Sequence, residues 1–411
     1  MMNILSSLHD HEVWMDFCAK KAAGGHTGKR ELHALEKFIE TQAYLPYADI
    51  AQAGQCFSPP KKVAISKMGS DKKRIVYIFP VQERTVLKLI TYLMQRKYDQ
   101  LFAPNLYSFR PGVGVRNAVD HLRKIPGIFQ MWAYKVDIRD YFNSIPVERM
   151  IATLQQKLPD EPELIRFLAG LLKNPTVLLD DAPIVDTAKG IMAGTPISTF
   201  LANLYLSELD WEFYKSGIPY ARYSDDIIVF APSEDRLEEA ICRIRSFLDQ
   251  CGLTVNPKKE NRFSPAEPWI FLGFQLSNDR IDVAPVSIEK LKAKMRRKTR
   301  ALKRWADKKG LPGTHAAKAF IRTFNRKLFE NPIDHELTWA RWYFPMLTTA
   351  DSLRQIDQYA QDCIRYLATG TRTKAAYNFR YADMKQLGYV SLVNRYYGQW
   401  QNPSDSEETV D

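Results

Sequence analysis

The chain has 411 residues, of which 45% are hydrophobic and 26% are charged, as in a globular protein with room for two or three subdomains. No apolar run reaches the roughly 20 residues of a membrane span, and residues 1–14 lack the apolar stretch of a secretion signal, so we expect a cytoplasmic protein with no membrane partner. The five cysteines form no CxxC pair and the seven histidines show no metal-binding spacing, which argues against a disulfide framework and a zinc site. Any metal would need carboxylate ligands, a preference of Mg²⁺.

The positive charge is concentrated in one segment. The net charge of the chain is +11, and residues 285–330 alone contain fifteen Lys and Arg against three Asp and Glu, a local net charge of +12. Such a segment is typical of a protein that contacts a phosphate backbone. Taken alone, it is equally compatible with an ordinary solvated helix.

Helical and strand-like patterns alternate along the first 285 residues. The first 55 residues are expected to be helical and peripheral. The following elements are predicted in chain order: strands at Lys62–Lys67 and Arg74–Phe79, a helix at 82–97, a strand at Trp132–Ile138, two helices within 147–180, one helix from Ser198 to Lys215, a strand–turn–strand at Arg222–Phe230, a helix at 234–250 and a strand near Leu253.

The pattern changes after residue 286. An apolar stripe at helical spacing runs between closely spaced Lys and Arg residues, and it consists of Ile288, Leu291, Met295, Leu302 and Trp305. This pattern predicts a long basic helix. The chain to about residue 400 is expected to be helical, and residues 401–411 are expected to be a loose acidic tail.

Three aspartates form the strongest candidate site. Asp137 ends an apolar strand, and Asp225 and Asp226 occupy a predicted hairpin turn. Adjacent carboxylates beside a buried strand repel one another and lose hydration, and a divalent cation would offset both costs. An Asp–Asp pair in a turn is usually a solvated feature, but the upstream strand that ends in Asp137 favours a metal site. Two ions roughly 3.5–4 Å apart could be bridged by Asp137 and Asp225, with Asp226 and the carbonyl of Ile138 as further ligands.

Seven motifs connect the chain to a known family. They are Tyr107–Gly112, Asp137–Phe142, Gly190–Ser198, Leu201–Tyr205, Tyr223–Asp226, Asn256–Lys259 and Phe271–Phe274. Over about residues 60–280, their order and spacing resemble those of reverse transcriptases. The C-terminal region, with Trp339–Pro345, Ile364–Gly370 and Leu387–Leu392, is similar to that of bacterial "unknown group" reverse transcriptases, a class that includes defence-associated enzymes related to group II intron and retron reverse transcriptases.

The resemblance implies an α+β fold, the right-hand polymerase fold with fingers, a palm made of an antiparallel sheet and helices, and a helical thumb. The expected parts are an N-terminal helical extension at 1–55, fingers and palm at 56–285, a basic thumb and C-terminal region at 286–400, and the tail at 401–411.

The resemblance also implies roles for individual residues. Phe142 matches the aromatic steric gate that excludes a ribose 2′-hydroxyl, and Lys259 matches a lysine that could protonate the pyrophosphate. The implied nucleotide-binding residues are Lys72, Arg74, Asp140, Tyr141, Phe142, Ala193 and Gly194, with Asp140 and Tyr141 acting through backbone N–H groups. The implied primer grip is Phe271, Leu272, Gly273 and Phe274. The implied nucleic-acid contacts of the thumb are Lys290, Lys292, Arg296, Arg297, Arg300, Lys303 and Arg304.

One position departs from the family pattern. The family usually has Gln where this chain has Ala193. That amide helps to position the incoming nucleotide and the template, so the departure bears on fidelity and substrate handling.

The expected function is RNA-directed DNA synthesis from dNTPs with two Mg²⁺ ions, or Mn²⁺ in their place. The expected partners are a structured non-coding RNA template and a DNA primer or product, in anti-phage defence. A retron-type or group II intron-like enzyme stays open, although the chain lacks a Val-Thr-Gly signature near the thumb and we expect no room for a maturase, HNH or RNase H module. A template-independent or protein-primed polymerase also stays open. An inactive, RNA-binding polymerase fold is disfavoured because all three aspartates are present.

Overall fold

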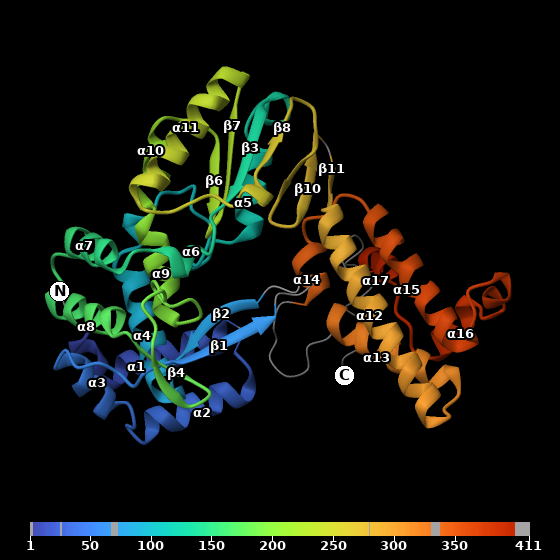
Figure 1. The fold of residues 1–411 in the computed structure, drawn as a ribbon, viewed down its shortest axis with the longest axis horizontal. Helices are drawn as coiled ribbons and strands as arrows, with labels where there is room; N and C mark the ends of the chain where they lie inside the picture. The colour runs from blue at the N-terminus through green and yellow to red at the C-terminus, as the bar shows by residue number, and fades with distance from the viewer. Residues whose placement is uncertain (1–2, 25–26, 67–72, 279, 330–337, 399–411) are drawn as a thin grey trace. The chain divides into compact units, whose positions relative to one another are not determined.

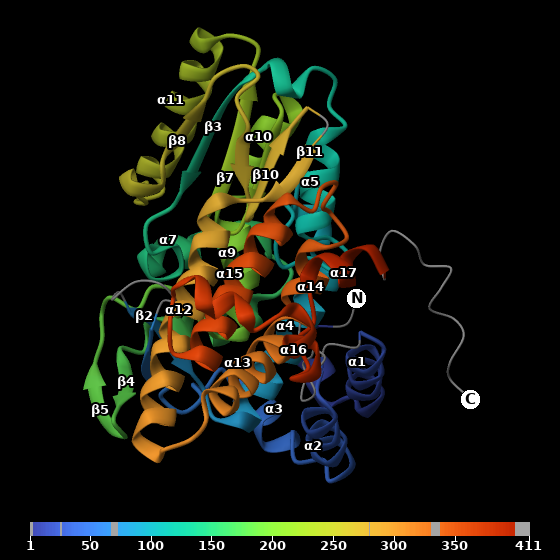
Figure 2. The ribbon, with the colours of Figure 1, turned by 90° about the vertical axis from the view of Figure 1, so that its right-hand side faces the viewer.

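The computed structural model describes residues 3–24, 27–66, 73–278, 280–329 and 338–398. The chain forms two compact units, one mainly of residues up to Glu267 and the other mainly of residues from Pro268 onward. Figure 1 and Figure 2 show the elements of each unit. The sequence had suggested a boundary near residue 285.

The N-terminal residues of unit 1 are helical, as expected. Their helices are η1 (Ser6–His9), α1 (His11–Ala23), α2 (Lys29–Glu40) and α3 (Leu45–Gln52). The Asp10 side chain accepts a hydrogen bond from the N–H of Glu12 and caps α1, and the buried rings of Trp14 and Tyr44 stack with centroids 4.8 Å apart. An aromatic cluster therefore joins these short helices to the core of unit 1.

One sheet of unit 1 has the strand order β2-β1-β4-β5. Its strands are β1 (Lys61–Ser66), β2 (Lys73–Ile78), β4 (Thr176–Leu179) and β5 (Ala182–Val185), and all pairs except β1–β4 are antiparallel. The first two strands match the prediction within one residue. The prediction of helix up to residue 180 was wrong, because Asp180 and Asp181 both adopt positive φ and close a two-residue β4–β5 hairpin.

Seven helices of unit 1 follow or separate these strands and supply much of its core. They are α4 (Val81–Lys97), α5 (Val115–Arg123), α6 (Tyr141–Ser144), α7 (Val147–Lys157), α8 (Pro162–Lys173), α9 (Pro196–Tyr205) and α10 (Ser207–Lys215). The single helix predicted from Ser198 to Lys215 is wrong, because the chain breaks at Leu206 into α9 and α10. At the break, the Ser207 hydroxyl donates to the carbonyl of Leu204, a local side-chain bond that competes with helix continuation.

The second sheet of unit 1 has the order β6-β7-β3-β8 and is antiparallel throughout. Its strands are β3 (Trp132–Asp137), β6 (Tyr220–Tyr223), β7 (Asp226–Ala231) and β8 (Asn261–Phe263). Helix α11 (Glu234–Gln250) lies along β7 and β3 (Figure 1). The strand predicted near Leu253 is wrong: that segment contributes only an isolated bridge between Val255 and Ile138.

Unit 2 combines a small antiparallel sheet with a helical bundle. The strands β9 (Trp269–Phe271), β10 (Phe274–Ser277) and β11 (Arg280–Val283) follow the order β11-β10-β9. Helices α12 (Pro285–Lys309), α13 (Gly313–Leu328) and α15 (Asp351–Thr369) pack pairwise against one another. The stripe predicted on α12 is buried at Ile288, Leu291, Met295 and Leu302, whereas Trp305 is 39% exposed. Thr299 and Ala306 complete the buried face instead.

The fold class is confirmed as mixed α+β with antiparallel sheets. The shorter elements are η2 (Asp99–Leu101), η3 (Ile128–Gln130), η4 (Pro257–Lys259), α14 (Trp339–Tyr343), η5 (Lys374–Asn378), α16 (Tyr381–Gln386) and α17 (Leu392–Tyr396). Among the described residues, no helix combines the length and the apolar character that crossing a bilayer demands.

Candidate active site

The three aspartates meet where β3 ends and the β6–β7 hairpin turns. Asp137 and Asp226 are cross-strand partners, and the N–H of Ile138 donates to the carbonyl of Asp225 at 3.0 Å. Directly opposed residues of antiparallel strands point to the same face. The apolar strands β3 and β7 therefore place carboxylates from residues about ninety positions apart at one sheet end.

Buried polar residues, none of them predicted as functional, hold the hairpin in place. Ser224 adopts φ 59, and its N–H donates to the Ser108 hydroxyl at 2.8 Å. Arg222, which is fully buried, donates to the Ser224 carbonyl at 3.2 Å and forms an ion pair with the equally buried Asp210. The only sequence signals were the Tyr107–Gly112 motif, which contains Ser108, and a charged residue within an apolar strand.

Cations and an amide surround the carboxylates. Lys259 forms an ion pair with Asp137 at 2.5 Å, and the Asn256 amide donates to the other oxygen of Asp137 at 3.2 Å. Lys135, whose role the sequence did not suggest, lies 3.2 Å from Asp226. The site thus balances its buried negative charge with two lysines.

The electrostatics favour addition of a cation at Asp225. Burial, followed by repulsion from Asp137 and Asp226, raises the pKa of Asp225 to about 6. Burial also raises the pKa of Asp226, and Lys135 opposes that shift. A raised carboxylate pKa means that the ionised form is disfavoured, and a divalent cation would relieve this.

The loop of residues 190–194 is tightly held between β2 and α6. Gly190 has φ 51, and a Cβ there would lie 2.5 Å from the carbonyl oxygens of Phe142 and Asn143, so only glycine fits. The carbonyl of Ala193 accepts from the N–H of Tyr77 in β2, and its N–H donates to the Asn143 side chain. The loop therefore connects the β2 strand to the helix that carries Phe142.

These elements enclose an open cleft of about 1100 Å³ within unit 1. The predicted site residues that line it are Arg74, Asp137, Ile138, Asp140, Tyr141, Phe142, Ala193, Gly194, Asp225 and Lys259. Asp226 is not among the residues that line the cleft. It is half-buried and pairs with Lys135. The ring of Tyr141 is buried and its hydroxyl donates to the Ala202 carbonyl.

The remaining predicted residues lie elsewhere. Lys72 is outside the described residues. The predicted primer grip forms the β9–β10 hairpin of unit 2, in which Leu272 and Gly273 both have positive φ, as in a two-residue turn. The predicted thumb contacts all lie on α12 of unit 2: Lys290, Arg296, Arg297, Arg300 and Arg304 are exposed, and Lys292 and Lys303 are half-buried.

Basic residues of α1 and α4 also line the cleft, which the sequence did not predict. Lys20 and Lys21 reach it from α1, and Arg84 and Lys88 reach it from α4. Burial lowers the pKa of Lys21 and the neighbouring Lys88 adds to the effect, while Glu31 opposes it. The cleft is therefore acidic at one end and basic along this wall.

The donors fit a hard divalent cation. Within the described residues, no group of three or more His, Cys, Asp or Glu side chains is arranged as a ready metal site, and lysines pair with Asp137 and Asp226. Asp137, Asp225 and Ile138 nevertheless present oxygen atoms to one cleft, and oxygen ligands are what Mg²⁺ selects.

An antiparallel sheet with carboxylates at a hairpin turn, facing a cleft with cationic walls, has the features of a nucleic-acid polymerase. The reverse transcriptase (RNA-dependent DNA polymerase) family matches residues 60–276, just over half of the chain. The chain belongs to that family.

Curated relatives agree with this membership at low identity. The chain is 25% identical over 289 residues to an uncharacterized 91 kDa protein in the cob intron of Schizosaccharomyces pombe, covering 54% of this chain and 35% of that protein. It is 28% identical over 106 residues to the retron Ec86 reverse transcriptase of Escherichia coli, covering 25% and 33%. It is 25% identical over 190 residues to the group II intron-encoded protein LtrA of Lactococcus lactis subsp. cremoris, covering 45% and 30%. The chain thus spans about a third of the length of these relatives.

Among solved structures, apo telomerase from Candida tropicalis is similar with a TM-score of 0.49 and 11% identity, covering 81% of this chain and 60% of that one.

Proposed function

We propose that this protein is an RNA-directed DNA polymerase that makes cDNA by two-metal nucleotidyl transfer. The observation that carries the proposal is the single cleft that brings Asp137 and Asp225 together with Arg74 and Phe142. Metal ligands, a phosphate-binding cation and a ring at the sugar position are the parts that template-directed synthesis from dNTPs requires.

The carboxylates would hold two Mg²⁺ ions, for which Mn²⁺ is a substitute. Asp137, Asp225, Asp226 and the carbonyl of Ile138 are the proposed ligands, and the ions would supply activation of the 3′-hydroxyl and charge stabilisation on the pyrophosphate. The Nζ of Lys259 lies 2.5 Å from a carboxylate oxygen of Asp137. From this position it can donate a proton to the leaving pyrophosphate.

The other cleft residues would bind and select the nucleotide. Arg74 would pair with its phosphates together with Lys72, and the backbone N–H groups of Asp140 and Tyr141 would donate to the triphosphate. The half-buried ring of Phe142 would stand against the sugar and exclude a 2′-hydroxyl. Ala193, which stands where the family usually has a Gln, and Gly194 both line the cleft and would contact the nucleotide.

The proposed roles extend to the rest of the chain. Residues 56–285 would form fingers and palm and residues 286–400 the thumb, with the N-terminal extension at 1–55 and the tail at 401–411. Phe271–Phe274 would grip the primer, and the basic face of α12 would follow the template–primer duplex through phosphate contacts. The proposed partners are therefore an RNA template, a DNA primer or product, and dNTPs.

For the biological setting we propose anti-phage defence with a structured non-coding RNA as template. The resemblance of Trp339–Pro345, Ile364–Gly370 and Leu387–Leu392 to the C-terminal region of the class that includes defence-associated enzymes supports this proposal. The match to a retron reverse transcriptase favours a retron-type enzyme as the second candidate. Sequencing the RNA that copurifies with the protein, and the DNA that it makes, separates these two candidates.

The polymerase proposal is tested by removing the metal ligands without changing the fold. Asp225→Asn with Asp226→Asn should abolish Mg²⁺-dependent dNTP incorporation and leave RNA binding intact, because the aspartates serve chemistry and α12 serves affinity. The matched control is Asp180→Asn with Asp181→Asn, another adjacent pair in a hairpin turn, which should keep full activity. Incorporation above background in the folded Asp225/Asp226 variant would exclude the proposed metal site.

A further inference from the structure

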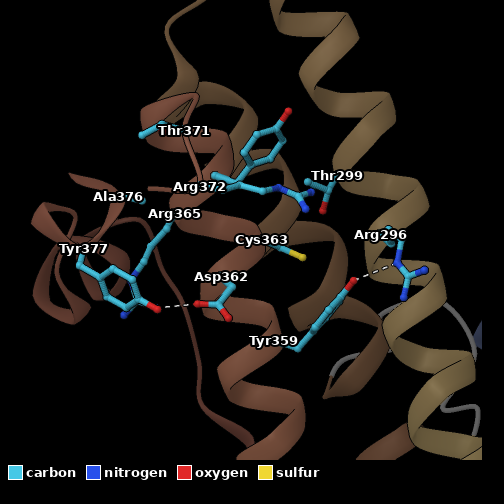
Figure 3. Close-up of a pocket in the computed structure, with 11 residues that line it drawn as sticks. Arg296, Thr299, Tyr359, Asp362, Cys363, Arg365, Thr371, Arg372, Ala376 and Tyr377 are labelled. Atoms are coloured by element: carbon cyan, nitrogen blue, oxygen red, sulfur yellow. Dashed lines mark hydrogen bonds and ion pairs between the residues drawn. The ribbon is translucent and has the colours of Figure 1, made fainter. Parts of the chain in front are cut away.

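A second cavity lies in unit 2, between α12, α15 and the chain that leads into η5 (Figure 3). It has a volume of about 280 Å³. Its walls carry three arginines and three tyrosines against one carboxylate, which are Arg296, Arg365, Arg372, Tyr359, Tyr366, Tyr377 and Asp362. Except for Arg296, none of these residues belongs to the expected nucleic-acid face of α12.

The arginines and tyrosines are paired. The guanidinium carbon of Arg365 lies 4.7 Å from the ring centroid of Tyr377, and that of Arg372 lies 4.7 Å from the ring centroid of Tyr366. Figure 3 shows Arg296 of α12 and Tyr359 of α15 directed toward one another, with a bond of 3.2 Å from Nε to the hydroxyl. Aromatic rings hold the guanidinium groups in place while their donors remain available.

The cavity has unused capacity to bind an anion. Asp362 accepts from Arg365 at 3.1 Å, whereas Arg296 and Arg372 have no ion pair with a described residue. The Nε of Arg365 is buried and finds no acceptor among the described residues, a condition that costs free energy until an oxygen is supplied. Burial raises the pKa of the Cys363 thiol, and Arg372 and Arg296 both oppose that shift, so both lie near this sulfur.

We propose that this cavity binds a single phosphorylated nucleotide, with arginines on the phosphate and tyrosines against the base. Its volume suits one nucleotide and excludes a duplex. Arg forks match phosphate oxygens, and rings stack on bases of any sequence. An acidic peptide would also use the arginines, but it offers nothing planar to the tyrosines. The nucleotide is either free or part of a single strand, since both present the same chemistry.

The test is photo-crosslinking of the full-length protein to 4-thiouridine probes in EDTA, which makes the readout independent of polymerase chemistry. One probe is a short oligouridylate that contains 4-thiouridine, and the other is free 4-thiouridine monophosphate. We expect crosslinks in the peptide that spans residues 359–377. A crosslink with both probes identifies a site for free nucleotides, and a crosslink with the oligonucleotide alone identifies a site for a strand; both support the proposal.

The variants test whether crosslinking requires the cavity or only the positive charge of unit 2. Arg372→Gln should lower the crosslink yield at least about fivefold, and Arg372→Lys should not restore it, because lysine keeps the charge but loses the fork and the stacking. Lys374 is exposed on η5, outside the cavity, so Lys374→Gln is the matched control and should leave the yield unchanged. An equal loss in this control, no crosslink within 359–377, or displacement by poly-glutamate as effective as that by oligouridylate would overturn the proposal.

Discussion

Phe142 occupies a position where one ring could determine the choice of sugar. It lines the cleft with Asp137 and Asp225, and its backbone is fixed by the bond from the N–H of Ile191 to its carbonyl. The ring is half-buried rather than a core side chain, with Phe109 as its neighbour at 6.4 Å. This location fits the proposed role of a steric gate.

We predict that Phe142→Val relaxes sugar discrimination. Removal of the ring opens space for a 2′-hydroxyl, so the specificity constant for rNTPs should rise relative to that for dNTPs by about tenfold or more, a difference of about 1.4 kcal/mol in transition-state binding. Steady-state kinetics with both nucleotides on one template–primer measure the ratio. If the ratio is unchanged in a folded variant, Phe142 only packs against Phe109.

Lys189 is a buried cation outside the proposed chemistry. It is 3% exposed, its Nζ donates to the carbonyl of Leu171, and burial lowers its pKa to about 8. The unfolded chain has the ordinary lysine pKa of about 10.4. Between these two values the unfolded state binds more protons than the folded state, so stability rises with pH.

We therefore predict a pH-dependent difference between the protein and Lys189→Met. The unfolding free energy of the protein, minus that of the variant, should increase from pH 7 to pH 10, by at most about 3 kcal/mol. Denaturant unfolding of both proteins at several pH values gives this difference. The contributions of the other titrating groups cancel in it, because both proteins contain them. A flat difference would mean that Lys189 titrates normally in the folded protein.

At the scale of elements, α12 divides its charges into two groups. Lys292 and Lys303 form ion pairs with Glu289 and Asp307 on the same helix. A second group is exposed, has no ion pair with a described residue and does not line the unit 2 cavity; it includes Lys290, Arg297, Arg300 and Arg304. These four residues can contact phosphates without breaking an ion pair.

We predict that charge reversal of these four residues to Glu weakens template–primer binding and flattens its salt dependence. Each lost phosphate contact should lower the slope of log affinity against log salt by about 0.7–0.9. The helix should persist, because its buried face is unchanged and Glu is a good helix former. Binding isotherms at several salt concentrations measure the slope.

The control reverses four other exposed cations of unit 2, which are Arg354, Lys374, Lys385 and Arg395. This control changes the net charge by the same amount, but the changes lie on α15, η5, α16 and α17. It should therefore leave most of the slope of log affinity against log salt unchanged. An identical slope for the α12 variant and the unmodified protein would exclude α12 from the nucleic-acid path.

At the scale of the whole molecule, each unit has its own buried polar anchor. In unit 1 it is the Arg222–Asp210 ion pair. Asp210 also accepts a hydrogen bond from the hydroxyl of Tyr220. In unit 2 it is Asp357 of α15, which accepts from the Tyr389 and Ser391 hydroxyls and from two backbone N–H groups at the start of α17. Because the two anchors lie in different cores, removal of each one should destabilise a different unit.

We predict that Arg222→Met destabilises unit 1 by about 3–5 kcal/mol, because it leaves Asp210 charged and buried. Asp357→Ala should cost about 1–3 kcal/mol for each orphaned donor that water does not reach. Hydrogen exchange followed by mass spectrometry should show faster exchange in β6 and β7 for the first variant and in α15–α17 for the second. Equal acceleration in both units for either variant would contradict separate cores.

The sequence by itself determined the α+β class, most elements of unit 1 and the aspartates of the proposed site. Strand alternation, turn residues and motif spacing are local properties, so β1, β2, β3 and the Asp225 turn follow from neighbouring residues alone. The basic helix α12 also follows from its local sequence pattern, except that Trp305 of the apolar stripe is 39% exposed.

Only the tertiary structure decided how the site is supported. The break between α9 and α10, the positive φ of Ser224 and the burial of Arg222 depend on partners such as Ser108 and Asp210, which no local pattern connects. Left-handed backbone costs about 1–2 kcal/mol at a non-glycine residue, so it persists only where surrounding contacts offset that cost. Those contacts join residues distant in the chain, and for this reason the cleft, its basic wall and the second cavity, in unit 2, became visible only in the folded protein.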